Sequence, residues 1–329
     1  MLKRLHNHDG LLFLAYLNDQ GQRLAADFDR PDAFQCKPGE ILWMHMCAIT
    51  PATREFLEND TELDEIIVRN LLAEETRPRS LVRKDGVLVI LRAMNLKENA
   101  DPEDMISLRI WMDDRHIITT RLRDTKSIED MQHYIETDDP PCSVGRFLTM
   151  ITDRVYGRME PFMEDQDDGA ARLEELLARQ DLDAIDDEAS TIRLQNAVYR
   201  RYIVPQKQLL EDLLASEVDW IEEEDREQLV ESLDRVTRYI ETLNDVRDRL
   251  AIINDETARQ HDASLNSTTY IFTAAATIFL PLSFLTGLLG VNVGGIPGIE
   301  YQPSFWIVLI LCIALAGTLV YYFRRKGWF

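Results

Sequence analysis

The sequence predicts an α/β domain, a long helical stalk behind it, and two transmembrane helices on the C-terminal side. Three observations lead to this fold class. Short apolar runs separated by polar turns fill the first 138 or so residues. Residues 170–286 contain no glycine, and only Pro205 and Pro281 interrupt them. After Asp262 the chain carries almost no charge.

The overall charge is strongly acidic. The 329 residues contain 36 Lys and Arg against 58 Asp and Glu, a formal net charge of −22. Such an excess of acid opposes binding to a phosphate backbone, so no nucleic-acid partner is expected. The four cysteines, at positions 36, 47, 142 and 312, are widely spaced and fit a reducing cytosol without a disulfide framework.

The α/β domain is predicted from five strand-like apolar runs with helical stretches between them. These runs cover residues 11–17, 41–47, 87–94, 105–112 and 116–122. Thr50 and Pro51 form an N-cap and a first helical position, which predicts a helix over residues 52–59. Two aspartates and two prolines at 138–141 mark the clearest linker.

Three long helices are expected after this linker, over about 143–180, 183–216 and 222–290. The third carries apolar residues at steps of three and four, which predicts a coiled-coil seam. The seam residues are Leu229, Leu233, Val236, Ile240, Leu243, Val246, Leu250 and Ile253. No helix breaker separates this seam from the apolar region behind it. We therefore expect one helix of about 65 residues, roughly 100 Å long at 1.5 Å per residue.

Two segments near the C-terminal end have the length and composition of membrane spans. Residues 270–289 and 305–323 are uncharged, and a hydrocarbon core about 30 Å thick needs about 20 apolar residues. The connection 290–304 contains no Lys or Arg, whereas Arg324, Arg325 and Lys326 follow the second span. Basic residues favour the cytoplasmic side, so both termini are expected in the cytoplasm of a multi-pass protein of the inner (cytoplasmic) membrane.

The expected domain organisation has seven parts. In chain order they are an α/β cytoplasmic domain at 1–140, a cytoplasmic helical hairpin at 141–221, a stalk helix at 222–269, a first transmembrane helix at 270–290, a periplasmic loop at 291–304, a second transmembrane helix at 305–323 and a basic cytoplasmic tail at 324–329.

A stripe of small or polar side chains runs through the first span. Steps of four and three from Asp262 meet Asn266, Thr269, Thr273, Ala276, Leu280, Ser283 and Gly287. Steps of seven back from Asp262 meet Asp255, Asp248 and Glu241. Asp255 has Arg259 four residues further on, a favourable helix pair, whereas the other three acids have no base at that spacing.

Two interpretations of this stripe stay open. It is either a solvated stalk face that leads into a small-residue packing face, or one wall of a pore. Two spans cannot enclose a pore, so the second interpretation requires an oligomer. Rings of carboxylates would then form an acidic funnel that concentrates cations, and uncharged oxygens would let ions pass without trapping them. Pro281 fits a pore wall, because it frees the carbonyl of Thr277 from its helix hydrogen bond.

The end of the first span resembles the CorA superfamily of divalent-cation transporters. That family is marked here by Gly-Met-Asn after a Met/Leu-Pro-Leu-Ser/Thr-Phe run, and this chain has Leu-Pro-Leu-Ser-Phe at 280–284 and Gly-Val-Asn at 290–292. Val291 replaces the methionine, and Val-Gly-Gly-Ile-Pro-Gly at 293–298 replaces the acidic loop usual in magnesium members. These departures look like the ZntB zinc-transporter branch, as does Glu-Thr-Arg-Pro-Arg at 75–79.

The resemblance implies a homopentamer with a cytoplasmic funnel, in which five first spans line the pore. Gly290, Val291 and Asn292 would form the entrance, where the Asn292 ring binds a hydrated ion. Asn266, Thr269, Thr273, Leu280 and Ser283 match the family's pore-facing positions. Zinc is the cargo that the branch implies, and the branch is associated with proton-driven import. Residues 263–299, however, contain no acid, His or Lys for a membrane proton relay.

Cofactor and enzyme signals are weak. His45 and Cys47, like His6 and His8, could place two ligands on one strand face, but such isolated pairs are weak zinc-site candidates. The uncharged pore oxygens suit a hydrated divalent ion and discriminate poorly among metals. No nucleophile–base pattern, phosphate loop or H-E-x-x-H motif occurs, so we expect no enzyme and no cofactor beyond the transported cation.

The expected function is divalent-cation transport with zinc as the preferred cargo. A magnesium, cobalt or nickel channel of the same superfamily is the first alternative. A membrane-anchored coiled-coil scaffold without transport is the second, although it would need neither the polar stripe nor the Gly-Val-Asn motif. Transport direction, energy coupling, selectivity among Zn, Ni, Co, Cd and Mg, and any regulatory metal site stay open.

Overall fold

The computed structural model of the chain describes residues 10–18, 23–24, 36, 39–98, 100–136, 140–291 and 302–326. The chain divides into two compact units, Met1–Ile253 and Asn254–Phe329. Their boundary falls inside helix α7 (Glu223–Leu289), which therefore contributes residues to both. The predicted fold class is confirmed: an α/β part is followed by a long helix and two apolar C-terminal helices.

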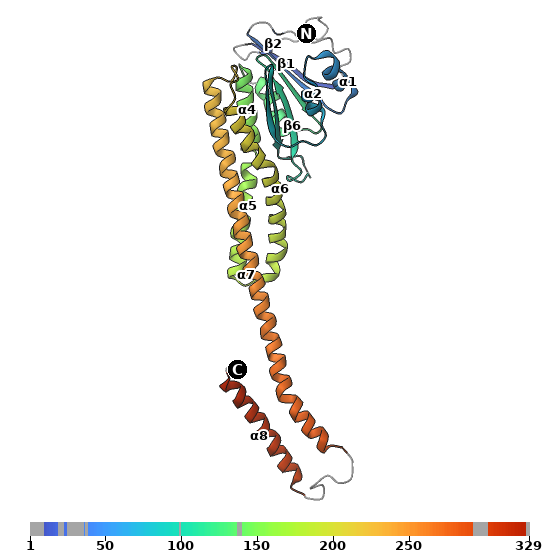
Figure 1. Cartoon of the computed structure of the whole chain (residues 1–329), viewed down its shortest axis with the longest axis vertical. Helices are drawn as coiled ribbons and strands as arrows, with labels where there is room; N and C mark the ends of the chain where they lie inside the picture. Colours follow the sequence, from blue (N-terminus) through green and yellow to red (C-terminus); the bar gives the residue numbers. More distant parts are fainter. Residues whose placement is uncertain are drawn as a thin grey trace. The chain divides into compact units, whose positions relative to one another are not determined.

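The first unit contains a seven-stranded mixed sheet (Figure 1). Its strands are β1 (Leu11–Asn18), β2 (Arg23–Leu24), β3 (Glu40–Cys47), β4 (Arg79–Arg83), β5 (Gly86–Ala93), β6 (Ile106–Met112) and β7 (His116–Arg121). The order across the sheet is β2-β1-β3-β7-β6-β5-β4. Neighbours run antiparallel except β3 and β7, which are parallel with Leu42 opposite His116. Both of these central strands therefore begin at the same edge of the sheet.

Five of the strands are those predicted from apolar runs, and β2 and β4 were not predicted. Side chains alternate between two apolar layers: Val87, Val89 and Leu91 contribute to one, and Leu88 and Ile90 to the other. β4 escaped prediction because it is an edge strand with arginine at both ends, and its side chains are exposed or half-buried. Charge on an edge strand hides the alternation that marks a buried one.

Helices cover both faces of the sheet. α1 (Pro51–Glu55), the π-helical turn η2 (Phe56–Asp60) and α2 (Glu65–Leu72) lie on one face, seen at the blue end of Figure 1. α3 (Lys126–Glu136) and α4 (Val144–Gly157) cover the other, where the rings of Trp43 and Phe147 meet edge to face with centroids 5.0 Å apart.

The helix predicted over 52–59 begins as expected but changes form. Thr50 is the N-cap and Pro51 the first helical residue. The Thr50 hydroxyl donates to the carbonyl of Cys47 at 2.9 Å instead of accepting from a helix N–H. After Glu55 the helix widens into η2, so the expected single α-helix is an α-turn followed by a π-turn.

The helical hairpin and stalk comprise α4, α5 (Glu160–Ala178), α6 (Leu182–Leu214) and α7. The single helix expected over 143–180 is two helices, because α4 ends at Gly157 and Pro161 opens the first turn of α5. The apolar seam predicted on α7 is buried or half-buried. Its C-terminal part, from Val246 to Ile253, packs against α5 and α6 of the same chain. That cluster contains Ala170, Leu173, Ile185, Ala189, Ile192, Val246, Leu250 and Ile253.

The second unit contains the last part of α7 and the whole of α8 (Ser304–Arg325). Among its described residues only Thr257, Ala274 and Phe323 are buried. Each helix has an 18-residue apolar stretch, of which 6% in α7 and none in α8 is buried inside the protein. A soluble hairpin in a protein core would be mostly buried, so these surfaces fit lipid or further helices.

Candidate functional site

The small and polar stripe lies on an exposed face of α7 within the second unit. Its members are Asn266, Thr269, Thr273, Ala276, Leu280, Ser283 and Gly287, and all are exposed. Apart from the helix backbone around Gly287 and its two chain neighbours, no described atom comes within 4 Å of a Cβ built on Gly287. Nothing in the described part of a single chain therefore requires a glycine there, and packing against another copy would be a reason for one.

Threonine hydroxyls on this helix bond to its own backbone. Thr273 donates to the carbonyl of Thr269 at 2.8 Å, and Thr277 donates to the carbonyl of Thr273 at 2.7 Å. These bonds use the hydroxyl protons and leave oxygen lone pairs free. The surface around Thr273 thus offers hydrogen-bond acceptors, which suit a cation and its waters better than an anion.

Leu280 is the one bulky apolar member of the stripe. Its side chain is 69% exposed, and that of the neighbouring Phe279 is 66% exposed. The helix continues unbroken through Pro281. Exposure in one chain does not separate a pore-facing Leu280 from a lipid-facing one, so this distinction stays a prediction.

The predicted entrance begins where α7 ends. Gly290 follows the last helical residue, and its N–H donates to the carbonyl of Thr286 at 2.9 Å. A Cβ at Gly290 would lie 3.1 Å from that same oxygen, which favours glycine here. Val291 is exposed. Asn292, together with His6 and His8, lies outside the described residues.

The four heptad acids are exposed, but their pairing differs from the prediction. Arg247 pairs with Asp248 at 2.6 Å, so Asp248 is not without a base. The guanidinium of Arg259 pairs with Glu256 at 3.2 Å and only donates to the backbone carbonyl of Asp255. In the rotamers that these two arginines adopt, their partners are acids one and three residues away in the sequence, whereas the prediction considered pairs four residues apart. Glu241 and Asp262 are exposed as expected.

The weak metal pair His45 and Cys47 gains no third ligand in the described part of the chain, where no group of three or more His, Cys, Asp or Glu could hold a metal ion. His45 is 1% exposed, and its Nδ1 lies 2.8 Å from the hydroxyl of Thr119, which also accepts from the Trp43 indole at 2.9 Å. Burial, and to a smaller extent Arg121, lowers the pKa of His45 to about 3.

His45 should make the first unit sensitive to acid. The unfolded chain takes up this proton below a pKa of about 6.5, but the folded chain does so only near 3, so stability is lost as pH falls through this window. Between pH 6.5 and 4.5 the loss in the free energy of unfolding is about 2 kcal/mol. The free energy of unfolding, measured in urea by tryptophan fluorescence at several pH values, should fall less steeply with decreasing pH in His45→Met than in the wild type. His133→Met, at an exposed position of α3, should keep the wild-type slope, and equal slopes in the two variants would contradict the assignment.

Two arginines that the sequence pattern did not single out, the buried Arg109 and the half-buried Arg92, bond to the backbone at the start of the Glu-Thr-Arg-Pro-Arg segment at 75–79 and just before it. Arg109 is 1% exposed and donates to the carbonyls of Ala73 at 2.5 Å and Glu74 at 3.1 Å, at the C-terminal end of α2. Arg92 donates to the carbonyl of Thr76 at 2.6 Å. Burial, and secondarily Arg92, lowers the pKa of Arg109 to about 10. Cations at a helix C-terminus are favourable, so Arg109 stabilises the end of α2 that leads into this segment.

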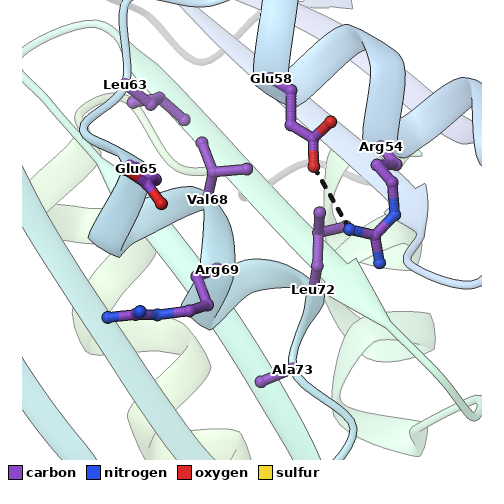
Figure 2. Close-up of a pocket in the computed structure, with 8 residues that line it drawn as sticks. All are labelled: Arg54, Glu58, Leu63, Glu65, Val68, Arg69, Leu72 and Ala73. Atoms are coloured by element: carbon purple, nitrogen blue, oxygen red, sulfur yellow. Dashed lines mark hydrogen bonds and ion pairs between the residues drawn. The ribbon is translucent and has the colours of Figure 1, made fainter.

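A hollow of about 590 Å³ lies between α1, η2 and α2 (Figure 2). Val68 and Leu72 form its apolar side, and Arg54 and Glu58 pair across its rim at 3.2 Å. Both side chains of that pair are about half exposed, so the ion pair adds less than about 1 kcal/mol. The hollow belongs to the first unit and contains no residue of the predicted ion route.

Comparison with known proteins gives concordant matches over nearly the whole chain. The model of the family described as CorA-like Mg²⁺ transporter protein matches residues 38–325. The chain is 32% identical over 321 residues, 97% of both chains, to the divalent cation transporter CmaX of Pseudomonas aeruginosa. It is 32% identical over 287 residues, 87% of both, to the zinc transport protein ZntB of Pectobacterium carotovorum. The solved structure of full-length CmaX aligns with a TM-score of 0.83 at 31% identity, covering 98% of this chain and 99% of that one.

Proposed function

This chain belongs to the CorA-like Mg²⁺ transporter family, and from that membership we propose that it moves divalent cations, with zinc as its main cargo, across the inner membrane. The exposed small and polar stripe on an otherwise apolar membrane helix carries this proposal. A lipid-facing helix would gain nothing from Asn266, Thr269 and Thr273 on its surface, whereas a pore wall requires such oxygens.

The pathway forms when five copies surround an axis. One chain supplies only two apolar helices among its described residues, and these leave their surfaces uncovered, so several copies are needed to enclose a pore. In this arrangement each α7 turns its stripe inward, and α8 faces lipid. The acids Glu241, Asp248, Asp255 and Asp262 line the cytoplasmic approach, and both termini lie in the cytoplasm, as the basic residues after α8 favour.

Zinc is preferred over magnesium for two reasons. A relative that is 32% identical over 87% of both chains is named a zinc transport protein. The loop 291–304 also contains a single acid, Glu300, eight positions after Asn292 in the sequence, whereas hard, strongly hydrated magnesium is usually bound through carboxylates. The stripe offers oxygen ligands only, so zinc passes with its hydration waters retained rather than through a tetrahedral site.

Radioactive zinc uptake into liposomes that contain the purified protein tests this proposal. Uptake above that of empty liposomes is expected, and excess unlabelled zinc should compete more strongly than magnesium. A second set with a proton gradient tests coupling, which must involve water or groups at the pore mouths because residues 263–299 contain no acid, His or Lys. The absence of any flux for Zn, Mg, Co and Ni would favour a membrane-anchored scaffold.

The acidic approach predicts a salt-dependent transport rate. Asp255 and Asp262 are exposed, and no described ion pair involves them. Replacing both by asparagine should lower uptake about 3- to 10-fold at 10 mM salt, because rings of charge raise the local cation concentration. At 1 M salt the screening length is about 3 Å and the variant should match the wild type.

The matched control replaces two exposed acids of α5, Asp165 and Asp168, by asparagine. This variant carries the same change in net charge and should transport normally at both salt concentrations. Equal losses in the two double variants would assign the effect to overall charge rather than to the funnel.

A further inference from the structure

Helices α4 and α7 lie side by side in the first unit. Arg146 of α4 donates to the side-chain oxygen of Gln228 at 2.6 Å, and Arg235 of α7 donates to the carboxylate of Asp153 at 2.8 Å. Each bond joins residues 82 positions apart, so the two helices run parallel in a constant register. The two bonded pairs therefore lie seven residues, or about 10.5 Å, apart along each helix.

A cavity of about 390 Å³ is lined by both of these bonded pairs. Between the pairs, its lining includes two short side chains, Thr149 on α4 and Ser232 on α7. Short side chains cannot fill the space that longer ones leave between two helices, and this accounts for the cavity. The rest of its wall is formed by Tyr134, Met150, Arg154 and Glu231.

The cavity is positively charged although the protein is strongly acidic. Its lining contains three arginines and two carboxylates, whereas the whole chain has a net charge of −22. Arg235 is paired with Asp153, but Arg146 bonds to a neutral amide. The guanidinium of Arg154 lies over the ring of Tyr134, 4.9 Å from its centroid, and within the described chain it forms no hydrogen bond or ion pair. A stacked guanidinium keeps its N–H groups available, so Arg154 can still bind an anion.

A buried hydroxyl in the wall of the cavity also lacks a partner. Ser232 is 5% exposed, and its side chain has no hydrogen bond to any other described residue. Thr149, by contrast, donates its proton to the carbonyl of Arg146 at 3.0 Å. Buried polar groups in proteins are hydrogen-bonded with few exceptions, so a free donor in a polar cavity indicates an acceptor inside it. Ser232, Arg146 and Arg154 together offer donors from both helices, which suits an anion with several oxygens.

We propose that this cavity binds a linear polyphosphate, either free or as the tail of a nucleotide. A guanidinium donates two parallel hydrogen bonds to a phosphate group, which suits arginine to phosphate recognition. Arg146 and Arg154 lie about 12 Å apart along α4, so their long side chains contact the two ends of a triphosphate while Ser232 donates to its middle. A single phosphate is too short to contact both arginines. The site lies in the first unit, outside the predicted ion route, and its binding is independent of the proposed transport.

Isothermal titration calorimetry on the full-length protein in detergent tests this proposal, with inorganic triphosphate as the probe. The buffer is low in salt and free of divalent cations, because salt screens the charges and triphosphate chelates metals. Saturable binding of one triphosphate per chain is expected, with orthophosphate at least about tenfold weaker. ATP distinguishes the two sources: an affinity equal to that of triphosphate supports a nucleotide tail, and a weaker one supports free polyphosphate. No saturable binding of triphosphate up to about 1 mM would overturn the proposal.

Arg154→Gln should weaken triphosphate binding about tenfold or more, because it removes a charged pair of hydrogen-bond donors. The fold should persist, since this side chain has no hydrogen bond within the described chain, and tryptophan fluorescence checks this. Ser232→Ala removes one neutral donor and should weaken binding about 3- to 10-fold. The matched control is Arg179→Gln, at an exposed position that ends α5, which makes the same change in net charge and should bind triphosphate as the wild type does.

Wild-type affinity in Arg154→Gln would overturn the proposal. An equal loss in Arg154→Gln and Arg179→Gln would also overturn it, because binding would then follow the overall charge. The other candidate occupant of the cavity is a second copy of the chain, which mass photometry tests. Arg154→Gln should leave the number of chains in the assembly unchanged, whereas a smaller assembly would make the cavity an interface between copies and overturn the polyphosphate site.

Discussion

Replacing Asn292 by alanine is expected to reduce zinc uptake to the level of empty liposomes while the pentamer stays assembled. In the proposed pentamer, five copies of this amide oxygen would accept hydrogen bonds from the waters around a divalent ion, without a charge that would hold the ion permanently. Alanine removes all five acceptors at once. Flux into liposomes measures the loss, and crosslinking or mass photometry measures the assembly.

Asn292→Gln is the informative companion variant. It keeps the amide but displaces it by one methylene, so partial uptake is expected if position as well as chemistry matters. Asn266→Ala, at the other end of the stripe, removes an amide from a wider part of the predicted route and should cost less. Wild-type uptake by Asn292→Ala would remove this residue from the entrance.

Replacing Leu280 by serine should raise the basal leak of cations through intact pentamers. Leu280 is the one bulky apolar residue on an otherwise small or polar stripe, and its side chain is exposed in the single chain. Five leucines around an axis would narrow the route and exclude water, and such hydrophobic constrictions gate by dewetting. Five serine hydroxyls would hold water in the route, so the leak should rise by about tenfold or more. Quenching of a cation-sensitive dye inside the liposomes, without a proton gradient, measures this leak.

Phe279→Ser is the matched control, because Phe279 is equally exposed and lies about 100° away around the helix. It should destabilise contacts with lipid or neighbouring helices without opening the route. If the two variants leak equally, or neither leaks, Leu280 does not face a pore and the register of the stripe is wrong.

The pattern of apolar and polar residues along the sequence predicted those strands and helices in which apolar residues recur at a regular spacing. The five apolar runs became β1, β3, β5, β6 and β7, and the uninterrupted helical pattern became α7. Arg79–Arg83 was missed because an edge strand needs no apolar alternation, and η2 was missed because nothing in Phe56–Asp60 distinguishes a π-turn from an α-turn. Such features depend on what the rest of the fold places beside the segment.

The candidate site also has some features that residue spacing predicted and others that it could not predict. Spacing alone placed the stripe on one helix face, and its residues are exposed there. Spacing could not tell that Arg247 would pair with Asp248, or that Arg259 would choose Glu256, because several rotamers of a long side chain reach different acids. The contacts of Trp43 and His45 with Thr119 were beyond local pattern altogether, since they depend on the pairing of two strands far apart in sequence.

The parallel pairing of β3 with β7 also determines how the first unit reaches its folded state. β4 to β7 follow one another through antiparallel neighbours, and β1 pairs with β3 in the same manner, so within each group paired strands are separated by at most the 21 residues between Asn18 and Glu40. Joining the groups brings Trp43 to Thr119, 76 positions away, at an entropic cost of about 4 kcal/mol for a loop of that length. Contacts of such long range form late and slowly. We therefore expect the indole of Trp43 to report a late step of folding, and a chain that has not completed this step would expose unpaired edges on both central strands, where a second unfolded chain can pair.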